Sequence, residues 1–563
     1  MNGEPEQQID LNIRGMTCDA CTAHVEKALS SVDGVVGVQI SGWASGRATA
    51  TVAAGVADQD LTQAIKDAGY RGQVVARQSF AGRPPSPEGS RDAEYDLVVI
   101  GTGGAGMAAA IKSAELGRRA CLIEAGTVGG TCVNIGCVPS KALIRTAAAY
   151  YAAGHHSFVG IRTRAEGLDW PEVMRQKDQL VAELRQNKYL DVLASYGDRI
   201  ELMQGRARVQ ADGSVVLDDG RVCRSEKLVI AAGAQPRILP LEGMDSVSVL
   251  DSTSAMALAK QPRSLLVLGG RAVALELGQT FARFGTAVTI LQRSERLIPE
   301  HEPQIAEALT DYLRAEGLTI HTGVQPTAIR QQDGSAVVMA DMDGQAREFR
   351  ADQVLVAVGR TPNTQELGLA EAGVELDGGG FIIVDDQLRT SNPNIYAAGD
   401  VTNRPKLVYV AAASGGIAAG NALSGEETQL DLTVLPDVIF TDPQVAAVGL
   451  TEAEAVAQGY EVQVATLPLA YVPRALAARD TRGVLKLVAD RASDRLLGAH
   501  VLAAEAGEVI QTAALAIECG RRYGFTVTDL RRQLVPYLTQ GEGLKLAAQT
   551  FEKDVSQLSC CAA

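Results

Sequence analysis

The stretch from Tyr95 to Leu116 most strongly limits what this chain can fold into. The apolar run YDLVVI (95–100) predicts a buried strand, the glycine run GTGGAG follows at once, and Met107–Leu116 predicts a helix. A glycine run alone is a weak signal, and an ordinary turn is the alternative. Because strand, glycine turn and helix occur here in this order, the stretch predicts a Rossmann-like dinucleotide-binding domain.

The glycines of this turn have a physical purpose in such a domain. Without side chains they let the backbone approach a pyrophosphate, which the free amide groups and dipole of the helix N-terminus attract. The next predicted strand, 120–123, ends at Glu124, where an acidic residue can bind a ribose hydroxyl. The predicted cofactor-binding residues are therefore Gly101, Gly103, Gly104, Gly106 and Glu124.

Two cysteines follow this fingerprint closely. In GGTCVNIGCVPSK (129–141), Cys132 and Cys137 lie five positions apart, and we expect both on a helix that begins near Thr131. A structural disulfide and a pair of buried thiols are the alternatives. A thiol near a helix N-terminus has a lowered pKa, so that its thiolate is available for exchange. The setting beside a nucleotide site favours a redox-active dithiol.

The segment GGTCVNIGCVPSK resembles the active-site signature of the flavin-dependent pyridine nucleotide-disulphide oxidoreductases, which include glutathione reductase and lipoamide dehydrogenase. The resemblance extends from about Glu94 to the C-terminus. It implies bound FAD, a thiolate at Cys137 against the flavin and substrate exchange at Cys132. It also assigns flavin contacts to four further residues, namely Gly130, Thr131, Lys141 near the reactive nitrogen and Asp400 on the ribityl chain.

A second dinucleotide-binding domain is predicted from Ser264. The strand 265–268 runs into Gly269-Gly-Arg271-Ala-Val-Ala274, which has arginine and alanine where the fingerprint has its second and third glycines. The following strand, 287–291, ends at Gln292 and is followed by Arg293 and Arg296 instead of an acid. Guanidinium groups there favour the 2′-phosphate of NADPH. A solvated surface pair of arginines is the alternative.

The N-terminal residues 9–76 predict a small βαββαβ module. Strands are expected at 9–13, 35–40, 47–52 and 73–76, with helices at about 22–31 and 60–68. The loop GMTCDAC sets Cys18 and Cys21 three positions apart and resembles the signature of heavy-metal-associated domains. Two thiolates at a helix start can hold one soft cation. Thiol exchange by a thioredoxin-like pair is the alternative.

Length and composition fit an α/β multidomain protein. The 563 residues allow about three to five domains. We expect the ferredoxin-like βαββαβ metal-binding domain, then two Rossmann-like domains and an α+β dimerisation domain. The expected boundaries are a heavy-metal-associated domain at 1–76, a flexible linker at 77–93, a flavin-binding domain at 94–250 and 365–432, an NADPH-binding domain at 251–364, a dimerisation domain at 433–550 and a tail at 551–563.

Charge and hydropathy exclude some classes of partner. The net charge is −15, which argues against nucleic acid. The N-terminal segment lacks the features of a secretory signal, and no uninterrupted apolar run is long enough to cross a membrane, so stable membrane insertion is not expected. Nine cysteines, several in close pairs, indicate redox or metal chemistry in a reducing cytoplasm.

The last domain carries a departure from the family pattern. Disulphide reductases of the family have a histidine that transfers the proton to the departing thiol. Here Tyr537 stands at that position, and a phenol is a poor general base at neutral pH. The family resemblance also implies a homodimer whose active site is completed by the partner subunit, with Tyr189 of one chain and Tyr537 of the other at the substrate.

The chain ends in Cys560-Cys561-Ala-Ala563, a pair of exposed thiols that can take a soft metal from small thiols. An incidental tail is the alternative. Together with the GMTCDAC module and Tyr537, the tail resembles the branch of the family that reduces Hg(II), delivered as small-thiol complexes, to volatile Hg(0) with NADPH. The alternatives are a disulphide or lipoamide reductase with an accessory metal module, and a metal-trafficking protein whose flavin resets its thiols.

Overall fold

The computed structural model describes residues 7–16, 19–40, 47–53, 55–79 and 93–558. The chain separates into two compact units, residues 1–93 and 94–563, and each is described by itself.

The N-terminal unit has the predicted βαββαβ order. Its four strands form one antiparallel sheet in the order β2-β3-β1-β4, and Ile9, Leu11 and Val25 belong to the apolar core between sheet and helices. The elements are β1 (Gln7–Arg14), α1 (Asp19–Ser30), β2 (Val35–Ile40), β3 (Arg47–Val52), α2 (Asp58–Asp67) and β4 (Arg71–Ser79). The ferredoxin-like expectation is confirmed.

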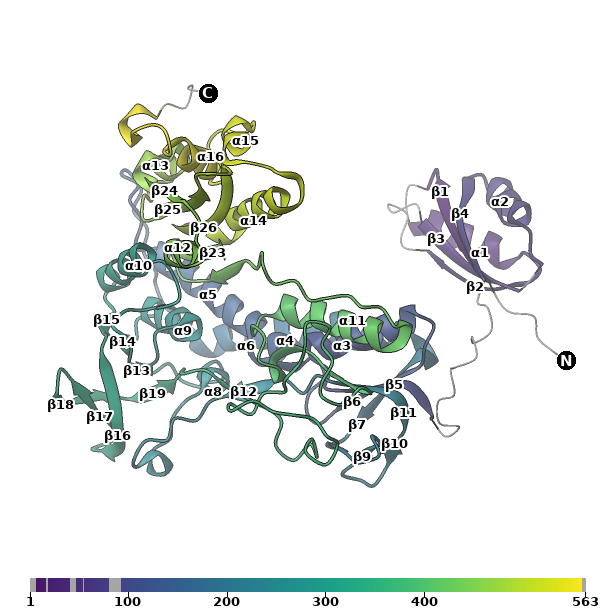
Figure 1. The fold of residues 1–563 in the computed structure, drawn as a ribbon, viewed down its shortest axis with the longest axis horizontal. Helices are drawn as coiled ribbons and strands as arrows, with labels where there is room; N and C mark the ends of the chain where they lie inside the picture. The colour runs from purple at the N-terminus through teal and green to yellow at the C-terminus, as the bar shows by residue number, and fades with distance from the viewer. Residues whose placement is uncertain (1–6, 17–18, 41–46, 54, 80–92, 559–563) are drawn as a thin grey trace. The chain divides into compact units, whose positions relative to one another are not determined.

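A five-stranded parallel sheet, in the order β21-β11-β5-β6-β7, forms the first dinucleotide-binding domain. Its strands are β5 (Tyr95–Ile100), β6 (Ala120–Glu124), β7 (Ile200–Gln204), β11 (Ser225–Ile230) and β21 (Ile395–Ala397). Helices α3 (Gly104–Glu115) and α11 (Val408–Ser424) lie side by side over one face (Figure 1). A small antiparallel sheet covers the other face, formed by β8 (Ala207–Val209), β9 (Val215–Leu217) and β10 (Val222–Cys223).

The segment carrying the predicted dithiol differs from the expected single helix. Helix α4 (Gly130–Ile135) ends before Gly136, whose backbone has φ −130° and ψ −108°, and α5 (Cys137–Ala152) begins at the second cysteine. Residues 145–205 are helical only in part. Helix α6 (Trp170–Arg185), the π-helical turn η1 (Gln186–Leu190) and α7 (Asp191–Ser195) follow a non-helical stretch, and β7 then joins the sheet.

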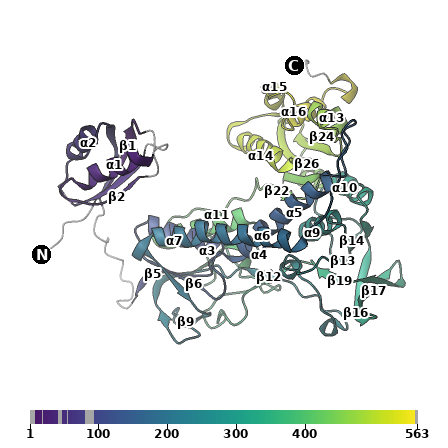
Figure 2. The ribbon, with the colours of Figure 1, turned by 180° about the vertical axis from the view of Figure 1, so that it is seen from behind.

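The second dinucleotide-binding domain repeats this design on a four-stranded parallel sheet in the order β15-β14-β13-β19. Helices α5, α6 and α9 pack together beside it (Figure 2). The elements of this domain are β13 (Ser264–Leu268), α9 (Ala272–Arg283), β14 (Ala287–Leu291), α10 (Pro303–Ala315), β15 (Thr319–His321), β19 (Gln353–Val356) and the antiparallel β16 (Val324–Gln332), β17 (Ser335–Met342) and β18 (Gln345–Ala351). A two-stranded ribbon returns the chain to the first dinucleotide-binding domain through β12 (Ala234–Pro236) and β20 (Arg360–Pro362).

The last domain is α+β, as predicted, with an antiparallel sheet in the order β22-β23-β26-β25-β24. Helix α14 packs on this sheet and shares its apolar core. The elements are β22 (Asp437–Ile439), β23 (Gln444–Gly449), α12 (Glu452–Ala457), β24 (Val462–Pro468), α13 (Pro473–Ala478), β25 (Val484–Asp490), β26 (Arg495–Ala503), α14 (Ala506–Tyr523), α15 (Val527–Arg532) and α16 (Glu542–Gln549).

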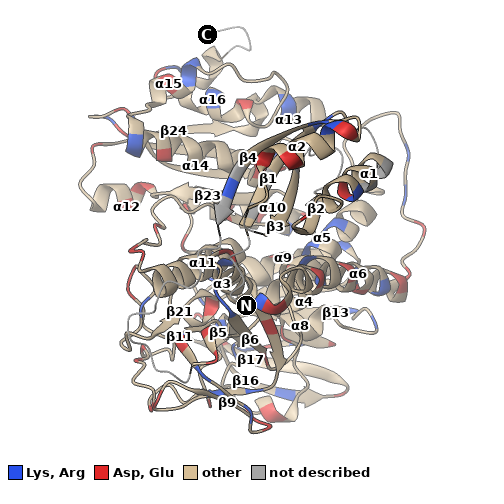
Figure 3. Cartoon of the chain, turned by 90° about the vertical axis from the view of Figure 1, so that its right-hand side faces the viewer, with Lys and Arg blue, Asp and Glu red and all other residues tan. Residues whose placement is uncertain are grey.

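Basic and acidic residues are intermixed along the helices of the chain (Figure 3). Within the described ranges, the structure contains no helix with both the length and the apolar character needed to cross a membrane.

Candidate active site

A cavity of about 1100 Å³ connects the first glycine turn with the two cysteines. It also reaches α9 of the second dinucleotide-binding domain and the segment around β22 of the last domain. Three parts of the fold that are far apart in sequence therefore meet at one elongated cavity, whose size suits a dinucleotide and a small substrate.

The glycine turn after β5 provides a close backbone approach that other residues would block. An ideal Cβ on Gly101, which has φ +106°, would lie 2.3 Å from the carbonyl oxygen of Ala231, and one on Gly106 would lie 1.8 Å from that of Gly101. At Gly130, φ is +63° and a Cβ would lie 2.5 Å from the Cα of Gly103. Gly103 is the N-cap of α3, so the turn presents free amide groups to the cavity. These features fit the pyrophosphate of FAD.

Glu124 lines the cavity and is held by the turn itself. Its Oε1 accepts a hydrogen bond from Gly126 N at 2.7 Å, and its Oε2 accepts hydrogen bonds from the backbone N (3.2 Å) and the hydroxyl of Thr102. Thr102 in turn accepts a hydrogen bond from Gly129 N at 3.0 Å. The carboxylate is thus preorganised beside the predicted ribose position, where its role stays a prediction.

The two cysteines meet across the break between α4 and α5. Both are partly buried and line the cavity, and their thiols share a hydrogen bond. The hydrogen bond from Cys132 and the charge of Lys141 lower the pKa of Cys137 to about 7, whereas the same hydrogen bond and burial raise the pKa of Cys132. Cys137 is therefore the thiolate of the pair near neutral pH. Its place as the first residue of α5 also favours the thiolate.

Lys141 is held by a residue that the sequence analysis did not identify. Its Nζ lies 2.7 Å from Glu276 Oε2 and 4.5 Å from the ring centre of Phe440. Glu276, on α9, is 7% exposed at its side chain and also accepts a hydrogen bond from Phe440 N at 2.9 Å. The sequence signal that could have identified Glu276 is an acidic residue within the apolar part of the helix that follows the second glycine turn. This ion pair connects both dinucleotide-binding domains beside Cys137.

The two predicted substrate tyrosines lie in different places. Tyr189, in η1, packs so close to Gly129 that an ideal Cβ there would lie 3.6 Å from its ring. Burial and the nearby charges of Cys132 and Cys137 raise its pKa. Tyr537 is 57% exposed on the last domain and is not among the residues that line the cavity. A single subunit therefore brings only Tyr189 to the dithiol.

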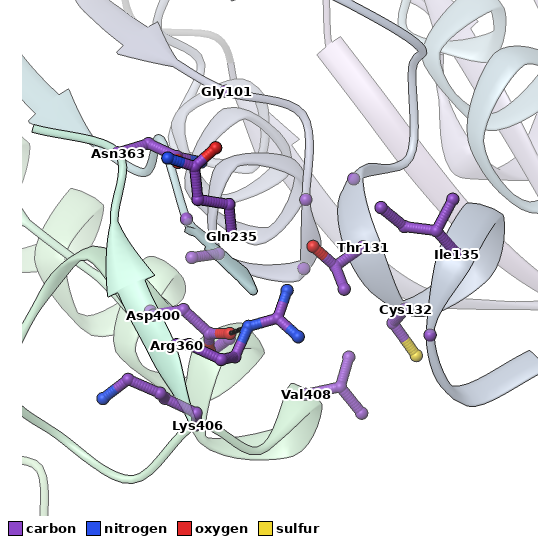
Figure 4. A pocket seen from close by; sticks show the side chains of 18 of the residues that line it. Gly101, Thr131, Cys132, Ile135, Gln235, Arg360, Asn363, Asp400, Lys406 and Val408 are labelled. Carbon is purple, nitrogen blue, oxygen red and sulfur yellow. Dashed lines mark ion pairs between the residues drawn. The ribbon is translucent and has the colours of Figure 1, made fainter. Parts of the chain in front are cut away.

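Asp400 lines the cavity opposite the cysteine segment, as Figure 4 shows. Burial raises its pKa, and its Oδ2 lies 4.0 Å from the Nε of Arg360. The Arg360 Nη2 donates a hydrogen bond to Ala234 O at 2.8 Å, and Lys406 also lies beside Asp400 and lines the cavity. A carboxylate with two cations nearby can accept hydrogen bonds from ligand hydroxyls, which suits the predicted ribityl contact.

The second glycine turn has the same topology but different chemistry. An ideal Cβ on Gly269 would lie 2.4 Å from Ala357 O, so this glycine is required sterically. Arg271, the N-cap of α9, lies 3.5 Å from Glu300. Arg293 is exposed, while Arg296 is half-buried and donates a hydrogen bond to Pro299 O at 2.7 Å. None of these three arginines lines the cavity around the dithiol.

Of the remaining predicted metal ligands, the structure describes only Cys21. Cys21 is half-buried on α1, but Cys18 lies outside the described residues, as do Cys560 and Cys561 of the tail. Their proposed pairings stay predictions.

Comparison with known proteins decides the family. The model of the pyridine nucleotide-disulphide oxidoreductases matches residues 95–415, and that of their dimerisation domain matches residues 435–548. The chain belongs to the pyridine nucleotide-disulphide oxidoreductase family. The model of the heavy-metal-associated domain additionally matches residues 10–71 of this oxidoreductase.

Relatives along nearly the whole length of this oxidoreductase are mercuric reductases. The mercuric reductase of Staphylococcus aureus is 42% identical over 98% of both chains. That of Acidithiobacillus ferrooxidans is 45% identical over 98% of both chains, and that of Shigella flexneri is 44% identical over 98% of this chain and 99% of its own. The chain is thus a flavoprotein oxidoreductase of the mercuric reductase group.

Solved structures with the same fold include the HOCl-induced flavoprotein disulfide reductase RclA from Escherichia coli and its Cu(II) complex. Both superimpose with a TM-score of 0.73 and cover 81% of this oxidoreductase and 99% of RclA, at 30% identity for the first and 31% for the second.

Proposed function

We propose that this protein catalyses the NADPH-dependent reduction of Hg(II) to volatile Hg(0), as a mercury detoxification enzyme of the cytoplasm. The observation that carries the proposal is the thiol pair at the end of the dinucleotide cavity, with Cys137 as a thiolate near neutral pH. Full-length mercuric reductase relatives support mercury as the substrate.

The chemistry divides between cofactor and protein. Bound FAD would supply a two-electron relay from the nicotinamide to the dithiol side of the cavity. Cys132 and Cys137 bind Hg(II) as thiolates and displace the small thiols that deliver it, which leave with the protons of the protein thiols. Two electrons from NADPH then account for the reduction of Hg(II) to Hg(0), and the metal leaves the dithiol.

Neighbouring side chains prepare the dithiol for this exchange. Lys141 favours the thiolate of Cys137 by its charge, and Glu276 holds Lys141 in place through the 2.7 Å ion pair. Tyr189 lies near the pair, and in this proposal its phenolic oxygen contacts the substrate. The flavin contacts we propose are the glycines of the first turn, Glu124, Thr131 and Asp400.

Further parts of the chain serve delivery and coenzyme choice in this proposal. Arg293 and Arg296 bind the 2′-phosphate of NADPH. Cys18 and Cys21 capture Hg(II), and the linker 77–93 raises the effective concentration of their domain at the catalytic unit. In a homodimer formed by residues 433–550, Tyr537 and the pair Cys560 and Cys561 complete the active site of the partner. The domain boundaries expected from the sequence belong to the same proposal.

A disulphide reductase is the second candidate, because RclA shares the fold and is named for that activity. Disulphide reduction needs a group that protonates the departing thiol. Among the described residues that line the cavity there is no histidine, and Tyr537 stands at the position of the family histidine. Reduction of a metal ion held by two thiolates has no such requirement, which favours Hg(II).

The test is NADPH oxidation by the holoenzyme with HgCl₂ in excess small thiol, with volatile mercury collected in parallel. We expect mercury-dependent turnover that Cys137→Ala abolishes. Cys519→Ala, on α14 away from the cavity, is the matched control and should retain activity. The double variant Cys560→Ala/Cys561→Ala should turn over more slowly when mercury is presented as a thiol complex.

Other outcomes distinguish the alternatives. Turnover driven by oxidised glutathione or lipoamide, without mercury loss, would support a disulphide reductase. Tight mercury binding without NADPH oxidation would support a trafficking protein.

A further inference from the structure

A second pair of cysteines lies in the core of the flavin-binding domain. Cys121 on β6 and Cys223 on β10 are 102 residues apart, yet their Sγ atoms are 4.0 Å apart. The two residues are 0% and 1% exposed and belong to the apolar cluster between the parallel sheet and the small antiparallel sheet. Neither lines the catalytic cavity, so the proposed reaction leaves this pair without a role.

A third sulfur completes the cluster. The Sδ of Met203, on β7, lies 3.6 Å from the Sγ of Cys223. Met203 stands opposite Ile123 in the parallel pair of β6 and β7, and Ile123 follows Cys121 by two residues. Met203 and Cys121 therefore point to the same face of the sheet, where Cys223 approaches from β10. Sheet pairing and the crossing strand place all three sulfurs together.

The geometry suits a three-coordinate soft metal ion. The Sγ atoms of Cys121 and Cys223 are 4.0 Å apart and the Sδ of Met203 is 3.6 Å from that of Cys223, which are spacings that one sulfur-bound ion can span. Two thiolates and a thioether are donors that soft ions prefer. Within the described ranges no group of three or more His, Cys, Asp or Glu could hold a metal ion, so this cluster depends on its methionine.

We propose that Cys121, Cys223 and Met203 form a second Hg(II) site, separate from the catalytic route. Hg(II) arrives as a complex with two small thiolates. Two bonds to the protein sulfurs form, the two bonds to the small thiolates break, and these leave as thiols with the protons of Cys121 and Cys223. The bound form is a neutral bis-thiolate with Met203 as the third, weaker donor.

Charge balance explains why this site selects a dication. A neutral complex adds no net charge to an apolar core, whereas a monovalent ion between two thiolates would bury one negative charge. A divalent ion that prefers sulfur to oxygen therefore fits this site best.

In this proposal the ion enters beside β10 and disturbs the flavin-binding domain. Strand β10 has only two residues at the edge of its sheet, it pairs only with β9 among the described strands, and Val222 beside Cys223 is 39% exposed. Separation of this short strand opens the cluster. Cys121 lies on the same strand as Glu124, which braces the first glycine turn through Thr102. We therefore expect slow loss of flavin when mercury exceeds the supply of small thiols.

The binding test uses the full-length holoenzyme with six cysteines replaced by serine, which leaves Cys121, Cys223 and Cys519. The replaced residues are Cys18, Cys21, Cys132, Cys137, Cys560 and Cys561. After incubation with HgCl₂ and washing with excess glutathione, native mass spectrometry should show one Hg(II) per chain. Cys223→Ala or Cys223→Ser should abolish retention, and the matched Cys519→Ala should not. No NADPH is present, so the result does not depend on turnover.

X-ray absorption then tests the third ligand. The mercury edge should show three sulfur neighbours, and Met203→Leu should reduce them to two while binding persists. Flavin absorbance before metal addition verifies that each variant is folded. Retention that survives Cys223→Ala, equal retention of Zn(II), or no retention by the folded protein would each overturn the proposal.

A second measurement tests the expected loss of flavin in protein that keeps all its other cysteines. Excess HgCl₂ should release flavin slowly from the parent protein, and Cys121→Val/Cys223→Ala should slow that release while leaving turnover at low mercury unchanged. Equal rates of flavin loss in both proteins would show that the site does not act on the flavin domain.

Discussion

The two dinucleotide-binding domains share a topology but treat the third position of their glycine fingerprint differently. In the first, a Cβ on Gly106 would lie 1.8 Å from the carbonyl oxygen of Gly101. In the second, Ala274 occupies the corresponding position, and its Cβ is accommodated in a fully buried place. The first turn is tighter, so the same motif demands glycine in one domain and accepts alanine in the other.

Their charges differ as well. The first turn is braced by Glu124, which accepts two hydrogen bonds from backbone N–H groups and one from the Thr102 hydroxyl. At the second turn, Arg271 is the N-cap of α9, and Arg293 and Arg296 follow β14. Ile298, fully buried with φ +36°, donates a hydrogen bond to Gly270 O at 2.9 Å. An acid suits a ribose hydroxyl and arginines suit a phosphate, so we expect the two nucleotide sites to differ in preference.

The largest expected effect comes from exchanging the third-position residues. Gly106→Ala should destabilise the flavin domain by about 3 kcal/mol, because the methyl group must displace backbone atoms. The purified variant should lose its flavin, measured as absorbance per chain after gel filtration, and unfold at lower urea.

The matched exchange is Ala274→Gly, which should cost only about 1 kcal/mol through helix propensity and a lost methyl contact. Equal losses in both variants would show that the two turns are equally tight.

The next effect concerns the contact between the domains beside Cys137. Lys141→Met removes a positive charge and should raise the pKa of Cys137 above its value of about 7, so that less thiolate is present at pH 7. Glu276→Gln removes a negative charge that raises this pKa and should lower it. Each pKa unit changes the thiolate fraction below the pKa about tenfold. The rate of iodoacetamide alkylation of Cys137 against pH measures both.

Shifts in the same direction for the two variants would contradict this account. Tyr196→Phe, a half-buried residue away from the cavity, is the control and should leave the alkylation profile unchanged.

A smaller effect is expected at the arginines after β14. Arg293→Ala/Arg296→Ala should raise KM for NADPH about tenfold and leave KM for NADH unchanged, because only NADPH carries the 2′-phosphate. Steady-state kinetics with both coenzymes give the ratio. Arg263→Ala removes an exposed arginine of the same domain that pairs with Asp352, and it should change neither value. A parallel rise in KM for both coenzymes would contradict a 2′-phosphate contact.

The smallest effect is expected from Arg271→Gly, which restores the missing second glycine. Arg271 and Glu300 form an exposed ion pair, worth at most about 1 kcal/mol. We expect at most about a fivefold change in KM for NADPH and an unchanged kcat. A much larger change would mean that Arg271 contacts the coenzyme directly.

Local sequence determined much of this protein. The first glycine turn, the cysteine spacing and the βαββαβ order were predictable because steric demand at a tight turn, thiol chemistry and side-chain periodicity depend on neighbouring residues. The break at Gly136 was missed, because a six-residue helix followed at once by another has the same apolar pattern as one continuous helix. The roles of Cys18, Cys560 and Cys561 rest on sequence resemblance alone.

Only the tertiary structure decided which distant residues meet. Glu276 reaches Lys141 from 135 positions away, and Cys223 reaches Cys121 from 102 positions away. Such pairs depend on which strands are neighbours and which helix covers them, and that arrangement follows from burial of the whole apolar surface. The sequence by itself therefore determined the chemistry of each site, while the packing of sheets and helices decided the charge beside Cys137 and the sulfur cluster in the core.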